Sequence, residues 1–155
     1  MNALLWAALL SMIPIGELRV GIPFAIATGL SPLTAFVVCV AANILIVPAV
    51  FFFLEFIHRR LLHMNSYQSA FDKFMERTRK KVNPLIEKYG MLGLAIFVAV
   101  PIPGTGAYTG ALAAWFFGMN KWKALISISI GVVAAGAIML GALLGGLKLI
   151  GLAIL

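Results

Sequence analysis

Two long, predominantly apolar runs dominate the hydropathy pattern of the chain, at residues 33–57 and 124–147. The hydrocarbon core of a bilayer is about 30 Å thick, and an α-helix of about 20 apolar residues crosses it. Each run is long enough, so each predicts one membrane-spanning helix. The pattern therefore predicts an all-α integral membrane protein.

Four other apolar stretches are shorter, at residues 1–13, 22–30, 90–100 and 111–118. They form two pairs, and each pair flanks a segment rich in proline and glycine. At 1.5 Å per residue, such limbs reach only about 12–20 Å, which favours two re-entrant hairpins. The alternative is a pair of short spanning helices, which would leave each polar break at a membrane surface.

A shift of 89 residues without a gap places residues 12–35 on residues 101–124. Both segments show the same order of short limb, Pro/Gly break, short limb, polar turn and long span, which indicates an internal duplication. A hairpin adds no crossing and the long helix adds one, so the two repeats have opposite orientations, as in secondary transporters. The predicted organisation is a single membrane domain, 1–155, with repeat 1 at 1–57, a linker at 58–89 and repeat 2 at 90–155.

Charge distribution orients this arrangement. Hydrophobic residues make up 63% of the chain and charged residues 11%, whereas soluble domains carry about 25% charged residues. Eight of the 12 Lys and Arg residues lie in the linker, which predicts a cytoplasmic linker, outward-facing termini and a multi-pass protein of the cell membrane. Because the net charge of +7 comes with no nucleic-acid-binding motif, we expect no nucleic-acid partner.

The linker has apolar positions spaced mostly three and four residues apart, with basic residues between them. This spacing predicts an amphipathic helix on the anionic inner leaflet, broken at Asn83-Pro84. A solvated connecting helix is the alternative. The expected membrane-surface contacts are Lys73, Arg77, Lys80 and Lys81.

The first break, IPIGELRVGIP, places Glu17 and Arg19 at membrane depth. A charge there costs about 2.5–3.5 kcal/mol, so an intramembrane ionisable residue indicates function. The alternative is that the two charges neutralise each other and fix the hairpin. The candidate site residues are Glu17, Arg19, Gly16 and Gly21, and Pro14 and Pro23 are the expected helix breakers.

The second break, PIPGTGAYTG, carries no charge. Its glycines allow backbone N–H groups to converge on an anion at the start of the following helical limb. With Arg19 opposite, this predicts a phosphate or carboxylate pocket at the midplane, and close helix packing is the alternative. The candidate residues are Gly104, Thr105, Gly106, Tyr108, Thr109 and Gly110, with Pro101 and Pro103 as breakers.

Other polar and small positions predict structural roles. We expect Asn43 and Ser127 to form hydrogen bonds between helices, and Gly141-xxx-Gly145 to form a helix contact or the seam of a homodimer. The single cysteine excludes an intrachain disulfide. No metal or other cofactor is expected, and the membrane segments lack the side-chain constellations of an enzyme.

The motifs Pro14-Ile15-Gly16-Glu17 and Pro101-Ile102-Pro103-Gly104-Thr105 give a layout that resembles the putative small multidrug export protein family. That family is similar to the DedA/VTT (SNARE-associated Golgi) superfamily, as a compact relative. Over essentially the whole chain, the resemblance implies opposed re-entrant hairpins, proton-coupled transport and movement of phospholipid or polyprenyl phosphate. It implies that Glu17 matches the acidic residue of the DedA Pro-Gly-Glu motif. Where the second DedA hairpin usually carries arginine, this chain has Gly106, Ala107 and Tyr108.

The first functional hypothesis is a transporter or flippase for an amphipathic anion, in particular a lipid phosphate such as polyprenyl phosphate. Arg19 and the backbone of residues 104–110 would hold the anion, and Glu17 would gate the site or carry a proton. The alternatives are an ion-coupled exporter of small organic molecules and a membrane organiser without transport activity, which needs neither charge. The expected partners are the substrate and the lipids of the anionic inner leaflet.

Overall fold

The computed structural model describes residues 2–57, 63, 65–100, 102 and 105–154. Within these ranges the secondary structure is helical without a strand, which confirms the predicted all-α class. The elements are α1 (Ala3–Ser11), α2 (Leu18–Ala27), α3 (Pro32–Phe52), a π-helical segment η1 (Phe53–Ile57), α5 (Asn65–Tyr89), α6 (Met91–Ala99), α7 (Ala107–Phe116) and α8 (Lys121–Ile154).

Two helical stretches are long and apolar enough to cross a membrane, Pro32–Ile57 and Lys121–Gly146. They correspond to the two predicted spans. The first begins where Ser31 accepts the Thr34 N–H with its side chain and Pro32 occupies the first turn. The second begins at Asn120, whose side-chain oxygen accepts the N–H of Trp122.

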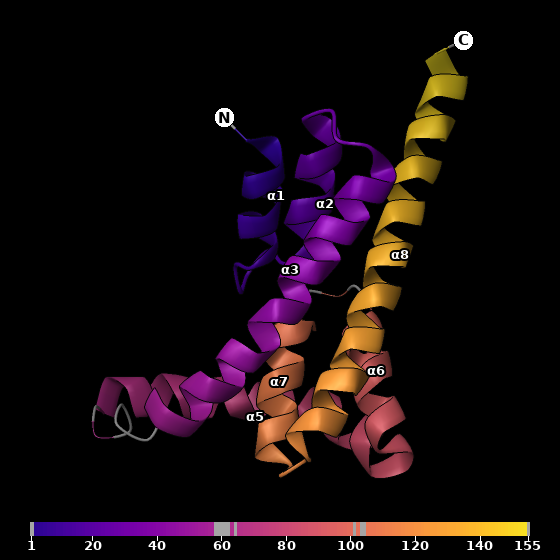
Figure 1. Cartoon of the computed structure of the whole chain (residues 1–155). Helices are drawn as coiled ribbons and strands as arrows, with labels where there is room; N and C mark the ends of the chain where they lie inside the picture. Colours follow the sequence, from indigo (N-terminus) through magenta and orange to yellow (C-terminus); the bar gives the residue numbers. More distant parts are fainter. Residues whose placement is uncertain (1, 58–62, 64, 101, 103–104, 155) are drawn as a thin grey trace.

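The two pairs of short helices lie at opposite ends of the molecule. Figure 1 shows α1 and α2 beside one half of the α3–α8 pair, and α6 and α7 beside the other half. Helix α3 contacts α1, α2 and α7, and α8 contacts α6, α2 and α7. The core therefore forms where α3 and α8 pass between the two pairs, around Cys39, Val47, Ile128 and Val132.

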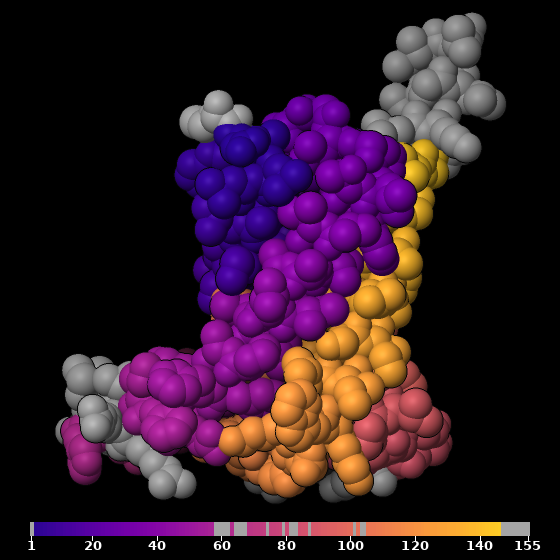
Figure 2. Space-filling model, viewed as in Figure 1, coloured from indigo at the N-terminus to yellow at the C-terminus, as the bar shows by residue number. Residues whose placement is uncertain are grey.

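The surface carries many large apolar side chains. Figure 2 shows α1, α3 and α8 side by side on one face, and contacts of α3 with both α1 and α8 agree with that view. Leu45 is 68% exposed and Ile130 is 59% exposed. Soluble monomers rarely expose extended apolar surface, so these exposed side chains suit contact with lipid.

Helix α5 lies across one end of the bundle and packs on α6 and α7 (Figure 1). Three of the four basic residues expected at a membrane surface, Lys73, Arg77 and Lys80, have exposed side chains on it. The side chain of Lys81 lies outside the described part of the structure.

The expected break of this helix at Asn83-Pro84 is wrong, because α5 continues through Pro84 to Tyr89. Proline removes one N–H from a helix and leaves the carbonyl four residues earlier without its usual donor. Pro84 is exposed, so water can satisfy that carbonyl and the helix persists.

Both polar breaks are shorter than predicted. Helix α2 begins at Leu18, so Gly21 and Pro23 lie inside it, and the assignment of Pro23 to the break is wrong. Proline is tolerated there because neighbouring helices and local adjustment can satisfy the single freed carbonyl. Tyr108, Thr109 and Gly110 likewise belong to the first half of α7.

Candidate functional site

Glu17 reaches from the first break to the start of α7. Its Oε2 atom accepts a hydrogen bond from the Ala107 N–H at 3.2 Å, and its Oε1 atom accepts one from the Tyr108 N–H at 3.3 Å. The first N–H groups of a helix have no partner within the helix, and the positive end of its dipole favours a carboxylate. Glu17 of repeat 1 therefore caps a helix of repeat 2.

The backbone of Glu17 has a conformation that side-chain residues rarely adopt, with φ 47° and ψ −141°. Among the described non-glycine residues, Glu17 alone has a positive φ. Gly90 precedes α6 with nearly the same angles, φ 55° and ψ −123°, at no steric cost. Such strain costs about 1–3 kcal/mol, and it is typical of functional sites.

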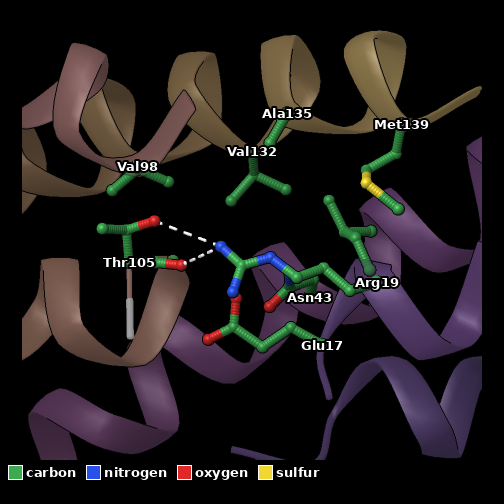
Figure 3. Close-up of a pocket in the computed structure, with 10 residues that line it drawn as sticks. Glu17, Arg19, Asn43, Val98, Thr105, Val132, Ala135 and Met139 are labelled. Atoms are coloured by element: carbon green, nitrogen blue, oxygen red, sulfur yellow. Dashed lines mark hydrogen bonds between the residues drawn. The ribbon is translucent and has the colours of Figure 1, made fainter. Parts of the chain in front are cut away.

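Arg19 binds the second break as well. Figure 3 shows its guanidinium beside Thr105: Nη2 donates to the Thr105 carbonyl at 2.7 Å and to the Thr105 hydroxyl at 3.1 Å. That hydroxyl lies 2.6 Å from the Val100 carbonyl, to which it donates. The ion pairs among the described residues do not join Glu17 to Arg19. The two charges do not simply pair with each other, because each one binds the second break.

The contacts between the breaks are reciprocal. The 89-residue shift pairs Arg19 with Tyr108, whose hydroxyl donates to the Met12 carbonyl at the first break. Each of these equivalent side chains thus bonds to a carbonyl in or beside the opposite break. The same shift pairs Glu17 with Gly106, where an added Cβ would lie 2.0 Å from Oε2 of Glu17. The carboxylate therefore fills space that a side chain in repeat 2 would occupy.

Asn43 on α3 is a site residue whose role the sequence analysis missed. It lines a pocket with Glu17, Arg19 and Thr105, and it is only 1% exposed (Figure 3). Its amide lies beside the Glu17 carboxylate, but neither amide atom makes a hydrogen bond of normal geometry within the described structure. Asn43 thus faces Glu17, but the expected interhelical hydrogen bond is not formed with normal geometry. It is confirmed for Ser127, which donates to the Met91 carbonyl.

The pocket itself is small and has one apolar wall. Its cavity volume is about 10 Å³, close to the minimum that holds one water molecule. Val98, Val132 and Ala135 form the side opposite the polar groups (Figure 3). The 89-residue shift pairs Asn43 with Val132. An amide within an apolar run, at a position where the other segment has valine, was the sequence signal that could have identified Asn43 as a site residue.

Other candidate residues lie around the pocket or outside it. Gly16 is buried in the first break, whereas Pro14 is exposed. Thr109 is buried and donates to the Gly106 carbonyl. Gly21 and Gly110 are equivalent under the shift, and both bring short helices into close contact: an added Cβ would lie 1.9 Å from Ser11 Oγ at the first and 2.7 Å from Val98 Cγ2 at the second. The positions of Pro101, Pro103 and Gly104 lie outside the described residues.

The fold and site together define a class: an α-helical membrane protein with a charged centre between two pairs of short helices. The family model described as "Putative small multi-drug export protein" matches residues 17–138. The chain belongs to this family, and the description of the family agrees with a transporter. Comparison with curated proteins and with solved structures found no match.

Proposed function

We propose that this protein is a transporter or flippase for an amphipathic anion, with a lipid phosphate such as polyprenyl phosphate as the substrate. One observation carries the proposal: a carboxylate and a guanidinium from repeat 1 meet the start of a repeat 2 helix in the centre of an apolar bundle. Ionisable groups are expensive at membrane depth, and they mark substrate and proton pathways.

The membrane arrangement that we propose has α1–α2 and α6–α7 as re-entrant hairpins of an inverted repeat. Helices of nine and ten residues reach only about 14–15 Å, half of the hydrocarbon thickness. The reciprocal bonds of Arg19 and Tyr108 support a pseudo-twofold relation. The proposal includes a relationship to the DedA/VTT superfamily and a position of the basic helix α5 at the cytoplasmic face of the cell membrane, for which the excess of Lys and Arg in residues 58–89 is the support.

An apolar groove beside the site supports a substrate with a hydrocarbon tail. Its volume is about 480 Å³, within the range of ligand pockets. Tyr108 belongs to both regions, because its N–H binds Glu17 and its side chain lines the groove. The other lining residues are Ile46, Ala49, Val50, Phe53, Leu54, Phe71 and Leu112. A headgroup at the polar pocket could therefore extend its tail along α3 and α7.

A second candidate function is ion-coupled export of small organic molecules, which the family description favours. In that case the apolar groove would hold the organic molecule, and Glu17 would carry the coupling ion. The two candidates differ in the substrate and share the same charged centre.

Reconstitution into proteoliposomes tests the proposal. One set of vesicles carries labelled polyprenyl phosphate and the other a proton-sensitive dye with small cationic drugs. We expect the wild-type protein to move lipid phosphate from one leaflet to the other. The variants Glu17→Gln and Arg19→Ala should each reduce the rate of this movement at least tenfold. Glu55→Gln is the control, because Glu55 pairs with Lys121 away from the pocket. Drug-driven proton flux without lipid phosphate movement would favour export. Folded variants with wild-type rates would exclude both candidates.

A further inference from the structure

We propose that the Glu17 carboxylate occupies the binding site of the transported anion and that Asn43 is part of this site. The anion binds only when Glu17 takes up a proton and moves out. This inference rests on the proposed transport function. The ligand class is a phosphate monoester or carboxylate headgroup.

The contacts of Glu17 are those of a bound anion. Its two oxygens meet two successive N–H groups at the start of α7, as oxygens of a phosphate or carboxylate ligand would. Backbone N–H···O bonds are commonly about 2.7–3.2 Å long, and these lie at or just beyond the long end of that range, at 3.2 and 3.3 Å. An incoming anion would use the same two N–H groups as its donors.

Asn43 is the independent sign of a missing ligand. Buried polar side chains normally have hydrogen-bond partners, and each exception requires an explanation. The Asn43 amide is 1% exposed and lies beside the Glu17 carboxylate in the pocket, but it makes no hydrogen bond of normal geometry among the described residues. An anion at the α7 terminus would give its Nδ2 an acceptor. Packing alone does not need an amide there, because Val132 fills the equivalent position of repeat 2.

Arg19 is prepared for the same ligand. Both of its hydrogen bonds use Nη2, so Nε and Nη1 remain without a protein partner within the described part of the chain. The guanidinium can therefore stay on Thr105 while a second edge turns to an anion. Its planar fork suits the oxygens of phosphate or carboxylate.

The size of the pocket makes Glu17 and the anion exclude each other. A cavity of about 10 Å³ holds at most one water molecule, so a headgroup has room only if the Glu17 carboxylate moves out. An ionised carboxylate displaced into apolar surroundings would be costly, and a proton from water removes that cost. One proton then enters Glu17, and one anionic oxygen group replaces the carboxylate on the two N–H groups.

The groups that face Glu17 allow this exchange. Arg19 on α2 is charged and Tyr108 on α7 is titratable, whereas Asn43 on α3, Val98 on α6 and Val132 on α8 carry no charge. Arg19 supplies a positive charge in both states. The charge of the pocket thus stays the same for a singly charged headgroup, which links anion binding to proton uptake.

Calorimetric titration of the purified protein in neutral detergent tests the exchange. The probes are dodecyl phosphate, inorganic phosphate and dodecanoate, each titrated in two buffers of different ionisation enthalpy. Wild type should take up about one proton more per bound probe than Glu17→Gln, because the titration of the probe itself is common to both. The affinity of wild type should therefore fall by an additional factor of about ten for each rise of one pH unit, and the affinity of Glu17→Gln should lack this additional factor. Glu55→Gln should match wild type.

Asn43→Val provides the second variant and copies the residue of repeat 2. It should bind each probe about tenfold more weakly with the proton number of wild type. Tighter binding of dodecyl phosphate than of inorganic phosphate would assign the site to a lipid headgroup, and equal binding would assign it to a free anion; either result supports the exchange when the proton difference is present.

Equal proton numbers for wild type and Glu17→Gln, or undiminished affinity in Asn43→Val, would overturn the exchange. If the exchange is overturned in this way but the wild-type protein still moves lipid phosphate in vesicles, the proposed transport function stands without the exchange of Glu17 and the anion. Absence of binding and of flux in every protein would overturn both.

Discussion

The two repeats contribute different chemistry to one centre. Repeat 1 provides the polar side chains of Glu17, Arg19 and Asn43, and repeat 2 has Gly106, Tyr108 and Val132 at the equivalent positions. Repeat 2 provides mainly backbone: two N–H groups for Glu17 and the Thr105 carbonyl for Arg19, with the Thr105 hydroxyl as the one side-chain acceptor among these contacts. The two segments therefore differ at the centre: the absence of a side chain at Gly106 leaves room for the Glu17 carboxylate.

Arg19 and Tyr108 give the largest expected contrast between the repeats. Arg19→Met removes two hydrogen bonds from a charged donor and should lower the free energy of unfolding by about 2–3 kcal/mol. Tyr108→Phe removes one neutral bond to the Met12 carbonyl and should cost about 1 kcal/mol. Unfolding in mixed micelles, followed by circular dichroism, measures both. Equal losses would contradict the asymmetry.

The equivalent glycines sharpen the comparison of the two short-helix pairs. Gly21→Ala places a methyl 1.9 Å from Ser11 Oγ, and Gly110→Ala places one 2.7 Å from Val98 Cγ2. Overpacking costs about 1–3 kcal/mol, so both should destabilise, with Gly21→Ala the more severe. Ser11→Ala should recover part of the loss in the first case only.

Gly141→Ala is the matched control for these glycines, because an added Cβ there meets no atom within 4 Å. It should leave the monomer as stable as wild type. A loss comparable to that of Gly21→Ala would mean that the close contacts between the short helices contribute little.

Exchange of the residues at positions 43 and 132 tests the polar difference directly. Asn43→Val removes a buried amide without a partner, and it should stabilise the protein by about 1 kcal/mol while weakening anion binding. Val132→Asn buries a second amide and should destabilise by a similar amount. Thermal unfolding with and without dodecyl phosphate measures both effects. A destabilised Asn43→Val would assign a structural role to the amide.

The smallest effect is expected outside the charged centre, at the surface pair of α5. Lys80 donates to Glu76 at 2.8 Å, and this hydrogen bond and its charge hold the pKa of Glu76 below the ordinary value of 4.5. The pair therefore adds its stabilisation above pH 4.5 and loses it as the pH falls through the lowered pKa. Lys80→Ala should raise the Glu76 pKa, as carbon NMR of the carboxylate would record, with little change in stability.

The same basic surface should prefer anionic lipid. Each Lys or Arg near such a surface is worth about 1 kcal/mol, and salt screens the attraction. Vesicle flotation at low and high salt, with wild type and Lys73→Gln/Arg77→Gln, measures the preference. Equal recovery with neutral and anionic vesicles at low salt would contradict it.

The sequence alone was enough to predict the two long helices and the two breaks, because apolar length is a local property. The cost of buried charge also singled out Glu17 and Arg19 as candidate site residues, and their role stays a prediction. The predicted anion pocket at the second break stays a prediction, and in the structure the N–H groups of Ala107 and Tyr108 bind the carboxylate of Glu17. The sequence did not predict that α2 begins at Leu18 and contains Pro23, or that α5 continues through Pro84. Packing and solvent decide whether a proline ends a helix.

Only the tertiary structure decided the partners. Glu17 and Arg19 stand two residues apart, so local sequence favours a mutual pair, but the crossing of α3 and α8 brings the second break within their reach. The same crossing puts Asn43 into the pocket without a partner. Hydropathy records how deep a residue lies and not what faces it, because a contact between residues about 90 positions apart depends on how the whole chain packs.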